Sequence, residues 1–381
     1  MKINQATIFP LSIPLIEPMK MAKELIVDAK TVLLCLTDDE GRQGWGEASA
    51  APLMTGETLD SLLASLKYLI ESARAIEWGD PNLFSKSCDA ILYGNPSAKS
   101  CLEMALLDLY TQKHSTSLWK YLRSLNSGAV SDELTEIPLL RMLGGAPEKE
   151  IADAKSFREA GFKHWKIKIG SLSLEEDLHR VQLLSDLLAG DVISVDANGA
   201  MSLDDALSFC TSAQAGKLSF AEQLISADSS LSDFTLLKQR SPIAIGLDES
   251  IHGSAEIEEF MGANALSGAS LKLIKTGGVI EAWNCAQILQ SNNLKLNLAC
   301  KVAETSLSGA ATASIGFAIG DVPWGFSMSN QYLRFDICDR PLTAKRGHLD
   351  LAQLNATGIG ITPNVDRVKD AVAQGYSIIQ Y

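Results

Sequence analysis

Three acidic residues recur at intervals of 26 residues: Asp196, Glu222 and Asp248. Each closes a short apolar run that is typical of a β-strand, and further strand-like runs contain the lysines Lys166, Lys168 and Lys272. A spacing of about 25 residues accommodates one strand, one loop and one helix, which is the repeat of a (β/α)8 barrel. Because barrel enzymes carry their chemistry at the C-terminal ends of the strands, the pattern predicts that these acids and lysines meet at one rim.

The pattern of predicted strands and helices divides the chain into three segments. Residues 1–125 contain strands followed by helical patterns at 57–76 and 97–123, with a hairpin turn at Asp38–Gly41, which predicts an α+β capping domain. Strands and helices alternate from there, and we expect a modified TIM barrel of seven or eight strands over 126–330, ending with a strand near 320–326. The segment 331–381 is expected to fold back on the cap and the barrel. Barrel helices are predicted at 147–160, 174–189, 202–215, 227–239, 254–262, 278–291 and 304–318.

Charge and composition exclude several classes of protein. The net charge is −13 and lysines and arginines form no dense run, so we expect no nucleic-acid partner. Apolar stretches fall short of the ~20 residues that span a bilayer, which predicts no membrane partner and, with no signal-like N-terminus, a cytoplasmic protein. The 7 cysteines are scattered without a C-x-x-C pair, which is typical of reduced thiols.

The carboxylates predict a site for a hard cation. Mg²⁺ prefers about six oxygen ligands and keeps some positions for water or substrate. Asp196, Glu222 and Asp248 on neighbouring strand ends meet that demand, and we expect one Mg²⁺ per subunit with a small carboxylate substrate in the remaining positions. Asn198 and Glu249 follow two of the ligands and are expected to hydrogen-bond the ligands or a bound oxygen.

The lysines predict proton transfer. Lys166 and Lys168 are two residues apart and share one face of a strand, whereas Lys272 lies on the sixth strand, across the barrel mouth. A substrate between them meets one base on each face, which suits abstraction of a proton α to a carboxylate. Burial and a nearby metal are expected to lower the pKa of these lysines. Lys275 has an odd offset from Lys272, so we expect it to face away from the interior in a structural role.

Taken together, these motifs resemble those of the enolase superfamily, and specifically its muconate lactonizing enzyme subgroup. The matching pieces are K-I-K at 166–168, D-A-N at 196–198, D-E-S at 248–250, L-K-L-I-K-T-G-G at 271–278 and, in the cap, G-W-G-E-A-S at 44–49. The resemblance implies the three acids as Mg²⁺ ligands, Lys168 and Lys272 as an opposed acid/base pair, and Lys166 as an electrostatic partner of the substrate carboxylate. It also implies that cap loops near 17–24 and 52–58 close over the substrate, and that the protein forms homo-oligomers.

Some residues depart from the family's patterns. Ser327 and Ser329 stand where dipeptide epimerases carry two aspartates that hold the substrate ammonium, and Lys301 replaces a small residue at the end of the seventh strand, ahead of the matching Glu304. With Arg141 on the first strand, Lys301 is expected to bind a second anionic or acyl group of the substrate.

The residues leave more than one function open. The first interpretation is a Mg²⁺-dependent racemase or epimerase acting on an N-acyl amino acid or a dipeptide-like compound through a metal-stabilised enolate. The alternative is a cycloisomerase or lyase, of the muconate-lactonizing or succinylbenzoate-synthase type, with the same residues. A catalytically silent barrel used for binding is a third possibility, although all six positions of the constellation are filled.

Overall fold

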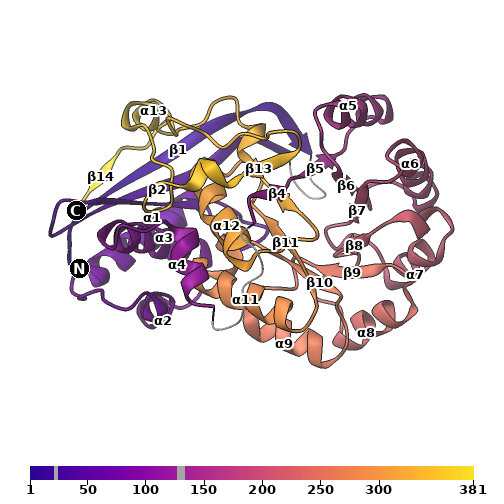
Figure 1. Ribbon diagram of the computed structural model, residues 1–381, viewed down its shortest axis with the longest axis horizontal. Helices are drawn as coiled ribbons and strands as arrows, with labels where there is room; N and C mark the ends of the chain where they lie inside the picture. The colour runs from indigo at the N-terminus through magenta and orange to yellow at the C-terminus, as the bar shows by residue number, and fades with distance from the viewer. Residues whose placement is uncertain (21–24, 127–133) are drawn as a thin grey trace.

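The computed structural model describes residues 1–20, 25–126 and 134–381. Figure 1 shows a strand-rich part that holds the N-terminus beside a ring of strands surrounded by helices. No helix in the described residues is both long and apolar enough to span a bilayer. The 7 cysteines are all free and buried, as expected for reduced thiols.

The N-terminal part is built on a four-stranded antiparallel sheet in the order β14-β1-β2-β3, in which β14 is the C-terminal strand Ile379–Gln380. Its strands are β1 Ile3–Lys20, β2 Leu25–Asp38 and β3 Gln43–Ser49, and the predicted hairpin turn lies between β2 and β3. The helices that follow are α1 Leu59–Ala73, α2 Phe84–Ile91, α3 Pro96–Lys113 and α4 Leu118–Ser124. Helix α3 is buried on nearly every side because it lies between this sheet and the barrel.

Two predictions in this part are corrected. The helix predicted over 97–123 is interrupted after Lys113, because Ser115 adopts a left-handed conformation with φ of 51° that a continuous helix cannot contain. Helix α2 was not predicted from the sequence. Of the expected substrate loops, residues 21–24 lie outside the described residues, whereas 52–58 precede helix α1.

The barrel is an eight-stranded parallel sheet in strictly sequential order, and an isolated bridge between Leu139 and Phe326 joins its two ends. The predicted fold class is therefore confirmed. The strands are β5 Leu140–Leu143, β6 His164–Lys168, β7 Val192–Asp196, β8 Phe220–Glu222, β9 Ala244–Leu247, β10 Gly268–Leu271, β11 Lys295–Ala299 and β12 Phe326–Ser327. The helices are α5 Pro147–Glu159, α6 Leu174–Leu187, α7 Leu203–Thr211, α8 Leu231–Arg240, α9 Ser254–Gly262, α10 Leu273–Thr276, α11 Val279–Ser291 and α12 Ser306–Ile319.

The C-terminal segment contacts both parts of the molecule. Strand β13, His348–Asp350, pairs with the short strand β4, Glu136–Pro138, so the run predicted as one strand over 137–143 is two. Helix α13, Val365–Asp370, follows, and β14, Ile379–Gln380, adds an edge strand to β1.

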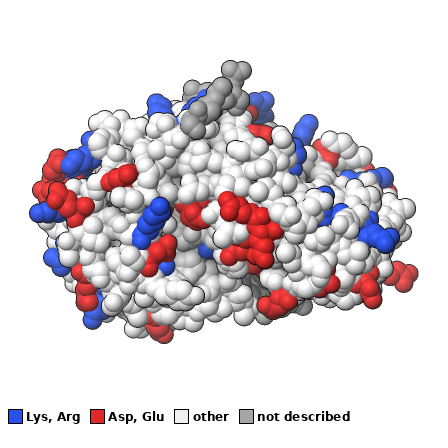
Figure 2. All heavy atoms as spheres, turned by 90° about the horizontal axis from the view of Figure 1, so that it is seen from below, with Lys and Arg blue, Asp and Glu red and all other residues white. Residues whose placement is uncertain are grey.

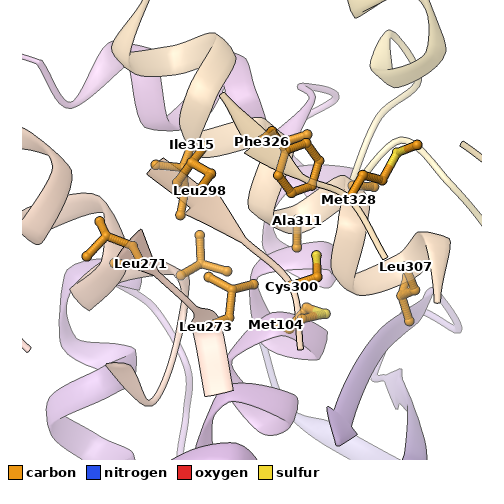
Figure 3. Close-up of a cluster of buried hydrophobic side chains, with 14 of the residues drawn as sticks. Met104, Leu271, Leu273, Leu298, Cys300, Leu307, Ala311, Ile315, Phe326 and Met328 are labelled. Carbon is orange, nitrogen blue, oxygen red and sulfur yellow. The ribbon is translucent and has the colours of Figure 1, made fainter. Parts of the chain in front are cut away.

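Packing fixes the strand ends around the barrel mouth. Figure 3 shows Leu298 of β11 and Cys300 just after that strand beside Phe326 of β12 and Met328 just after it, with Leu307, Ala311 and Ile315 of α12 and Met104 of α3 around them. All of these side chains are buried. Burying such a set removes several hundred Å² of apolar surface from water, and each Å² contributes about 25 cal/mol of stabilising free energy. This close packing holds the C-terminal ends of β11 and β12 in place.

Acidic side chains are prominent on the surface in Figure 2, in line with the net charge of −13. On the face seen in Figure 2, acidic side chains gather in clusters while lysines and arginines are scattered singly. This face therefore offers no basic stripe for a phosphate backbone.

Candidate active site

A pocket opens at the C-terminal ends of the barrel strands, where the sequence placed the site. Eight of the predicted site residues line it: Lys166, Lys168, Asp196, Asn198, Asp248, Glu249, Lys272 and Lys301. Residues of the N-terminal part, among them Ile26, Leu53 and Met54, form part of the wall. Strands β6 and β10 are the second and sixth of eight, so Lys168 and Lys272 enter the pocket from opposite sides of the barrel.

Lys168 and Asp196 are paired across β6 and β7. They are partners in the strand register, and the ammonium nitrogen of Lys168 lies 2.6 Å from Oδ2 of Asp196. Lys168 also donates to Oδ1 of Asn198 at 2.8 Å. Asn198 has a φ of 45°, which turns the chain so that its backbone N–H donates to Asp196 and its amide donates to Glu249. Asn198 therefore hydrogen-bonds Asp196, one of the predicted metal ligands, and also Glu249.

Lys166 and Glu222 form the deepest pair. Glu222 is fully buried below the pocket, opposite Asp196 in the register of β7 and β8. The ammonium of Lys166 lies 2.5 Å from Oε2 of Glu222 and 3.9 Å from Oδ2 of Asp196. Two residues apart on one strand, Lys166 and Lys168 thus reach neighbouring carboxylates from the same face, as the period of a strand requires.

Asp248 is held by two lysines. Lys272 contacts one of its carboxylate oxygens, and Lys275 donates to the other at 2.5 Å and also to the Asp248 carbonyl oxygen. The expectation that Lys275 faces away from the interior is wrong. Strand parity does not apply to it because the chain enters helix α10 directly after Lys272, which brings Lys275 back toward the site.

Gln223 is a site residue that the sequence did not single out for a role. Its Oε1 accepts hydrogen bonds from the backbone N–H groups of Asp248 and Ser250, and its Nε2 donates to Ile225 O and Ser250 Oγ. Gln223 is fully buried, with a φ of 38°. This side chain fixes the chain that carries Asp248, and the only signal in the sequence was its place directly after Glu222.

Burial and neighbouring charges set the ionisation of the site. Burial raises the pKa of Glu222 to about 7 despite the opposing effect of Lys166. Burial also opposes ionisation of Asp248, but Lys272 and Lys275 hold the pKa of that carboxyl below its usual range. The pKa values of Lys166 and Lys272 are raised, because their carboxylate neighbours outweigh burial. The expected lowering of the lysine pKa values rests on burial together with a nearby metal, and burial alone does not produce it for these two residues, whereas burial lowers the pKa of Lys275.

The donor set fits a divalent cation. Both carboxylate oxygens of Glu222 are buried, Oε2 beside the Lys166 ammonium and Oε1 without a hydrogen-bond donor in the described part of the chain, and Asp196 and Asp248 lie at the ends of the strands on either side. Within the described residues, no three carboxylate, thiol or imidazole groups converge on one centre, since Asp196 and Asp248 are drawn to the lysines. In this structure the negative charge of the three carboxylates is balanced by the ammonium groups of the neighbouring lysines. A hard divalent cation bound between the carboxylates would supply positive charge at the same place.

Two predicted site residues lie behind the pocket wall. Arg141 alternates with Leu140 and Met142, which line the pocket, so its side chain leaves the opposite face of β5. Its guanidinium lies 3.8 Å from the centre of the Phe157 ring and 4.9 Å from that of Tyr332, and it contacts Gln331. The expectation that Arg141 faces the pocket is therefore not met, whereas Tyr332 lines it.

Glu304 is also buried away from the pocket lining. Its Oε2 accepts the backbone N–H of Lys301 at 2.7 Å, which fixes the turn after β11. Burial and the nearby Glu47 raise the pKa of Glu304 to about 8. Glu47, from strand β3, in turn accepts hydrogen bonds from Thr305 and Ser308 at the start of α12.

The chain matches two family models. Residues 3–122 match the N-terminal domain of the mandelate racemase/muconate lactonizing enzyme family, and residues 149–368 match the enolase C-terminal domain-like family. Among curated relatives, the chain is 27% identical over 368 residues to a hydrophobic dipeptide epimerase of Citrifermentans bemidjiense, covering 95% of this chain and 98% of that protein.

Solved structures share the fold. The dipeptide epimerase of Cytophaga hutchinsonii, complexed with Mg and D-Ala-L-Val, superimposes with a TM-score of 0.88 at 22% identity over 100% of both chains. An N-succinyl Arg/Lys racemase of Bacillus cereus gives a TM-score of 0.88 at 22% identity, also over 100% of both chains. Together with the matched models, the geometry shows that this chain belongs to the mandelate racemase/muconate lactonizing enzyme family of the enolase superfamily.

Proposed function

We propose that the protein is a Mg²⁺-dependent racemase or epimerase that moves the α-proton of an amino-acid derivative. One observation carries this proposal: Lys168 and Lys272 line the same pocket from opposite sides of the barrel, and each contacts a carboxylate at its mouth. A reaction that inverts a carbon centre needs a base on one face and an acid on the other. The names of the relatives, which include epimerases and a racemase, agree with this chemistry.

The lysines would act in turn. The unprotonated amine of one lysine takes the α-proton, and the C–H electron pair passes into the substrate carboxylate to give an enolate. The ammonium of the opposite lysine then returns a proton to the other face, so that one enantiomer becomes the other. Lys166, beside Glu222 and Asp196, adds fixed positive charge near the substrate carboxylate.

Asp196, Glu222 and Asp248 would hold the cation. One Mg²⁺ bound there supplies Lewis-acid stabilisation of the negative charge that develops on the substrate oxygens. Gln223 keeps Asp248 in position, and Asn198 orients Asp196 and Glu249 through its hydrogen bonds. The cap side chains Leu53 and Met54 help to exclude water from the pocket.

Exchange of the α-proton in D₂O with Mg²⁺, followed by ¹H NMR, tests the proposal on a panel of dipeptides and N-acyl amino acids in both enantiomeric forms. The wild type is expected to exchange and invert. Lys168→Ala and Lys272→Ala are each expected to lose inversion by a factor of about 10³ or more while exchange of one enantiomer persists, a different one in each variant. Exchange without inversion in the wild type would instead support the one-base cycloisomerase or lyase chemistry.

A further inference from the structure

A buried ion network lies behind the strand end that carries Lys168. It consists of Glu150 on α5 and of Asp177 and Arg180 on α6, two helices that lie next to each other outside β6 (Figure 1). These residues are 1%, 0% and 8% exposed. Nε and Nη2 of Arg180 donate to the two oxygens of Glu150 at 3.0 and 2.5 Å, and Nη1 donates to Asp177 at 2.7 Å. None of the three is among the described residues that line the pocket.

The network holds the backbone at the end of β6. Nη2 of Arg180 donates to the carbonyl oxygen of Lys168 at 3.1 Å. Two residues further on, the N–H of Gly170 donates to Oδ2 of Asp177 at 2.7 Å. Helix α6 therefore binds the chain directly at Lys168 and again just after it, while the Lys168 side chain enters the pocket.

Strand β7 holds the same segment from the other side. The N–H of Ile169 donates to the carbonyl oxygen of Asp196 at 3.0 Å. Gly170 then adopts a left-handed conformation with φ of 84°, which turns the chain out of the strand. Glycine reaches such a conformation without steric cost, but it also leaves the chain free to choose other directions. The hydrogen bonds from α6 and β7 remove that freedom where the strand ends.

The cost of burying these ions argues for a role in geometry. Taking charged groups out of water costs free energy, and well-packed hydrophobic residues often stabilise a fold equally well. A guanidinium differs from them because it is planar and donates in fixed directions, here to two carboxylates and one carbonyl at once. A displacement of about 1 Å at a reacting group can lower a rate on the order of 100-fold, so fixed geometry has a large effect at a base.

We propose that Arg180 and Asp177 are positioning residues for Lys168, because they hold the end of β6 so that the Lys168 amine reaches the substrate α-carbon from its side of the pocket. This inference rests on the proposed function, in which Lys168 and Lys272 serve opposite faces of the substrate. Lys272 follows β10 on the opposite side of the barrel, where its ammonium contacts Asp248. A defect in the network should therefore impair one base and spare the other, which a general loss of stability would not do.

Exchange of the α-proton in D₂O, followed by ¹H NMR for each enantiomer of a compound that the wild type racemises, tests the proposal. Lys168→Ala identifies the enantiomer whose proton faces Lys168, because it is the one whose exchange that variant loses. In the double variant Glu150→Met/Arg180→Met, exchange of that enantiomer should fall about 10- to 100-fold, whereas exchange of its mirror image should stay within about twofold. Both residues are replaced together so that Glu150 is not left as a buried carboxylate without its partner.

Two substitutions at Asp177 test the second contact. Asp177→Leu cannot accept the Gly170 N–H and should lower exchange of the same enantiomer, while Arg180 keeps Glu150 as its partner. Asp177→Asn retains an accepting oxygen and should restore most of the exchange. Urea denaturation shows whether each variant is folded.

Arg158→Met is the matched control. Arg158 also joins α5 to α6, but at the opposite end of α6, where it donates to the carbonyl oxygens of Leu187 and Ala189 and pairs with Asp191 at 3.2 Å. Its replacement should leave the exchange of both enantiomers unchanged.

The outcomes distinguish the positioning role from the proposed function. Equal exchange of the two enantiomers relative to wild type in Asp177→Leu and in the folded double variant, whether lowered or not, would overturn the positioning role and leave the racemase standing. If the wild type exchanges no compound of the panel, the proposed function fails, and crystal structures of wild type and Asp177→Leu then decide the positioning. A Lys168 ammonium displaced from Asp196 would support it, and an unchanged position would overturn it.

Discussion

The ammonium nitrogen of Lys168 lies 2.6 Å from Oδ2 of Asp196, so a candidate base and a candidate metal ligand share one contact. The same arrangement recurs across the barrel, where Lys272 contacts Asp248. A cation bound by these carboxylates lies close to both ammonium groups, and like charges at that distance repel. Metal binding and the protonation of the lysines are therefore coupled.

Lys168→Met is expected to tighten Mg²⁺ binding. Removing the ammonium removes a like charge beside Asp196 and leaves the carboxylate available, so the dissociation constant should fall on the order of tenfold. Isothermal titration calorimetry with MgCl₂ measures it. Lys163→Met is the control, since Lys163 is exposed just before the same strand. An unchanged or weaker affinity in Lys168→Met would show that Lys168 does not compete with the metal.

Removal of Mg²⁺ is expected to lower the thermal stability of the wild type. A ligand that binds only the folded state at a hundred times its dissociation constant stabilises by about 2.7 kcal/mol. EDTA should therefore lower Tm, and excess MgCl₂ should restore it. Glu222→Gln should abolish the response, because the buried carboxylate is a proposed ligand, whereas Glu258→Gln on the exposed face of α9 should retain it. A full Mg²⁺ response in Glu222→Gln would remove that residue from the ligand set.

Gln223→Leu is expected to destabilise the protein by about 2–4 kcal/mol, because it leaves buried backbone and hydroxyl groups without their partners. Urea denaturation measures the loss. Gln182→Leu is the matched control, since that amide donates to Asp186 on the outside of α6. The variant should also show a smaller Mg²⁺-dependent rise in Tm, because Asp248 is no longer held. Equal stability of the two variants would contradict this role.

The sequence predicted the parts of the site that depend on periodicity. Strand spacing placed the acids and lysines at one rim, and the period of two placed Lys166 and Lys168 on one face. Periodicity fails where the backbone leaves the regular strand. Lys275 reaches Asp248 because a helical turn begins at Leu273, and the role of Gln223 depends on a left-handed backbone that has no signature in composition.

Two further errors, at Arg141 and at Ser115, have local causes. Arg141 alternates with Leu140 and Met142, and because these two apolar side chains line the pocket, strand parity places Arg141 on the outer face. The interruption at Ser115 follows a continuous helical pattern and depends on a single positive φ. The pKa values of Lys166 and Lys272 are raised because their carboxylate neighbours exceed the effect of burial, and the predicted lowering depends in addition on the charge of a bound metal.

Arg141→Met is expected to raise KM about three- to tenfold with a smaller effect on kcat. The guanidinium lies between the Phe157 and Tyr332 rings, and its loss frees Tyr332, which forms part of the pocket wall. Steady-state kinetics on whichever compound exchanges its α-proton measures both constants. Arg158→Met is the control, because Arg158 bonds surface carbonyl groups at the end of α6. A selective loss of kcat would argue for a direct role of Arg141 in the reaction.

Glu103→Gln is expected to make the protein relatively more stable as pH rises. Glu103, on α3, is fully buried and accepts the N–H of Ile280 at 2.8 Å at the start of α11. Burial, with smaller contributions from Asp89 and Glu281, raises its pKa from 4.5 to about 8. A carboxyl whose pKa is higher in the folded state contributes stability that is fully present below pH 4.5 and is lost as pH rises through about 8.

Glutamine cannot ionise, so the difference in unfolding free energy between variant and wild type should shift in favour of the variant by about 1 kcal/mol or more between pH 5 and pH 9. Urea denaturation at both pH values measures the shift against the exposed control Glu71→Gln, and parallel pH profiles of Glu103→Gln and wild type would show that Glu103 does not titrate in this range.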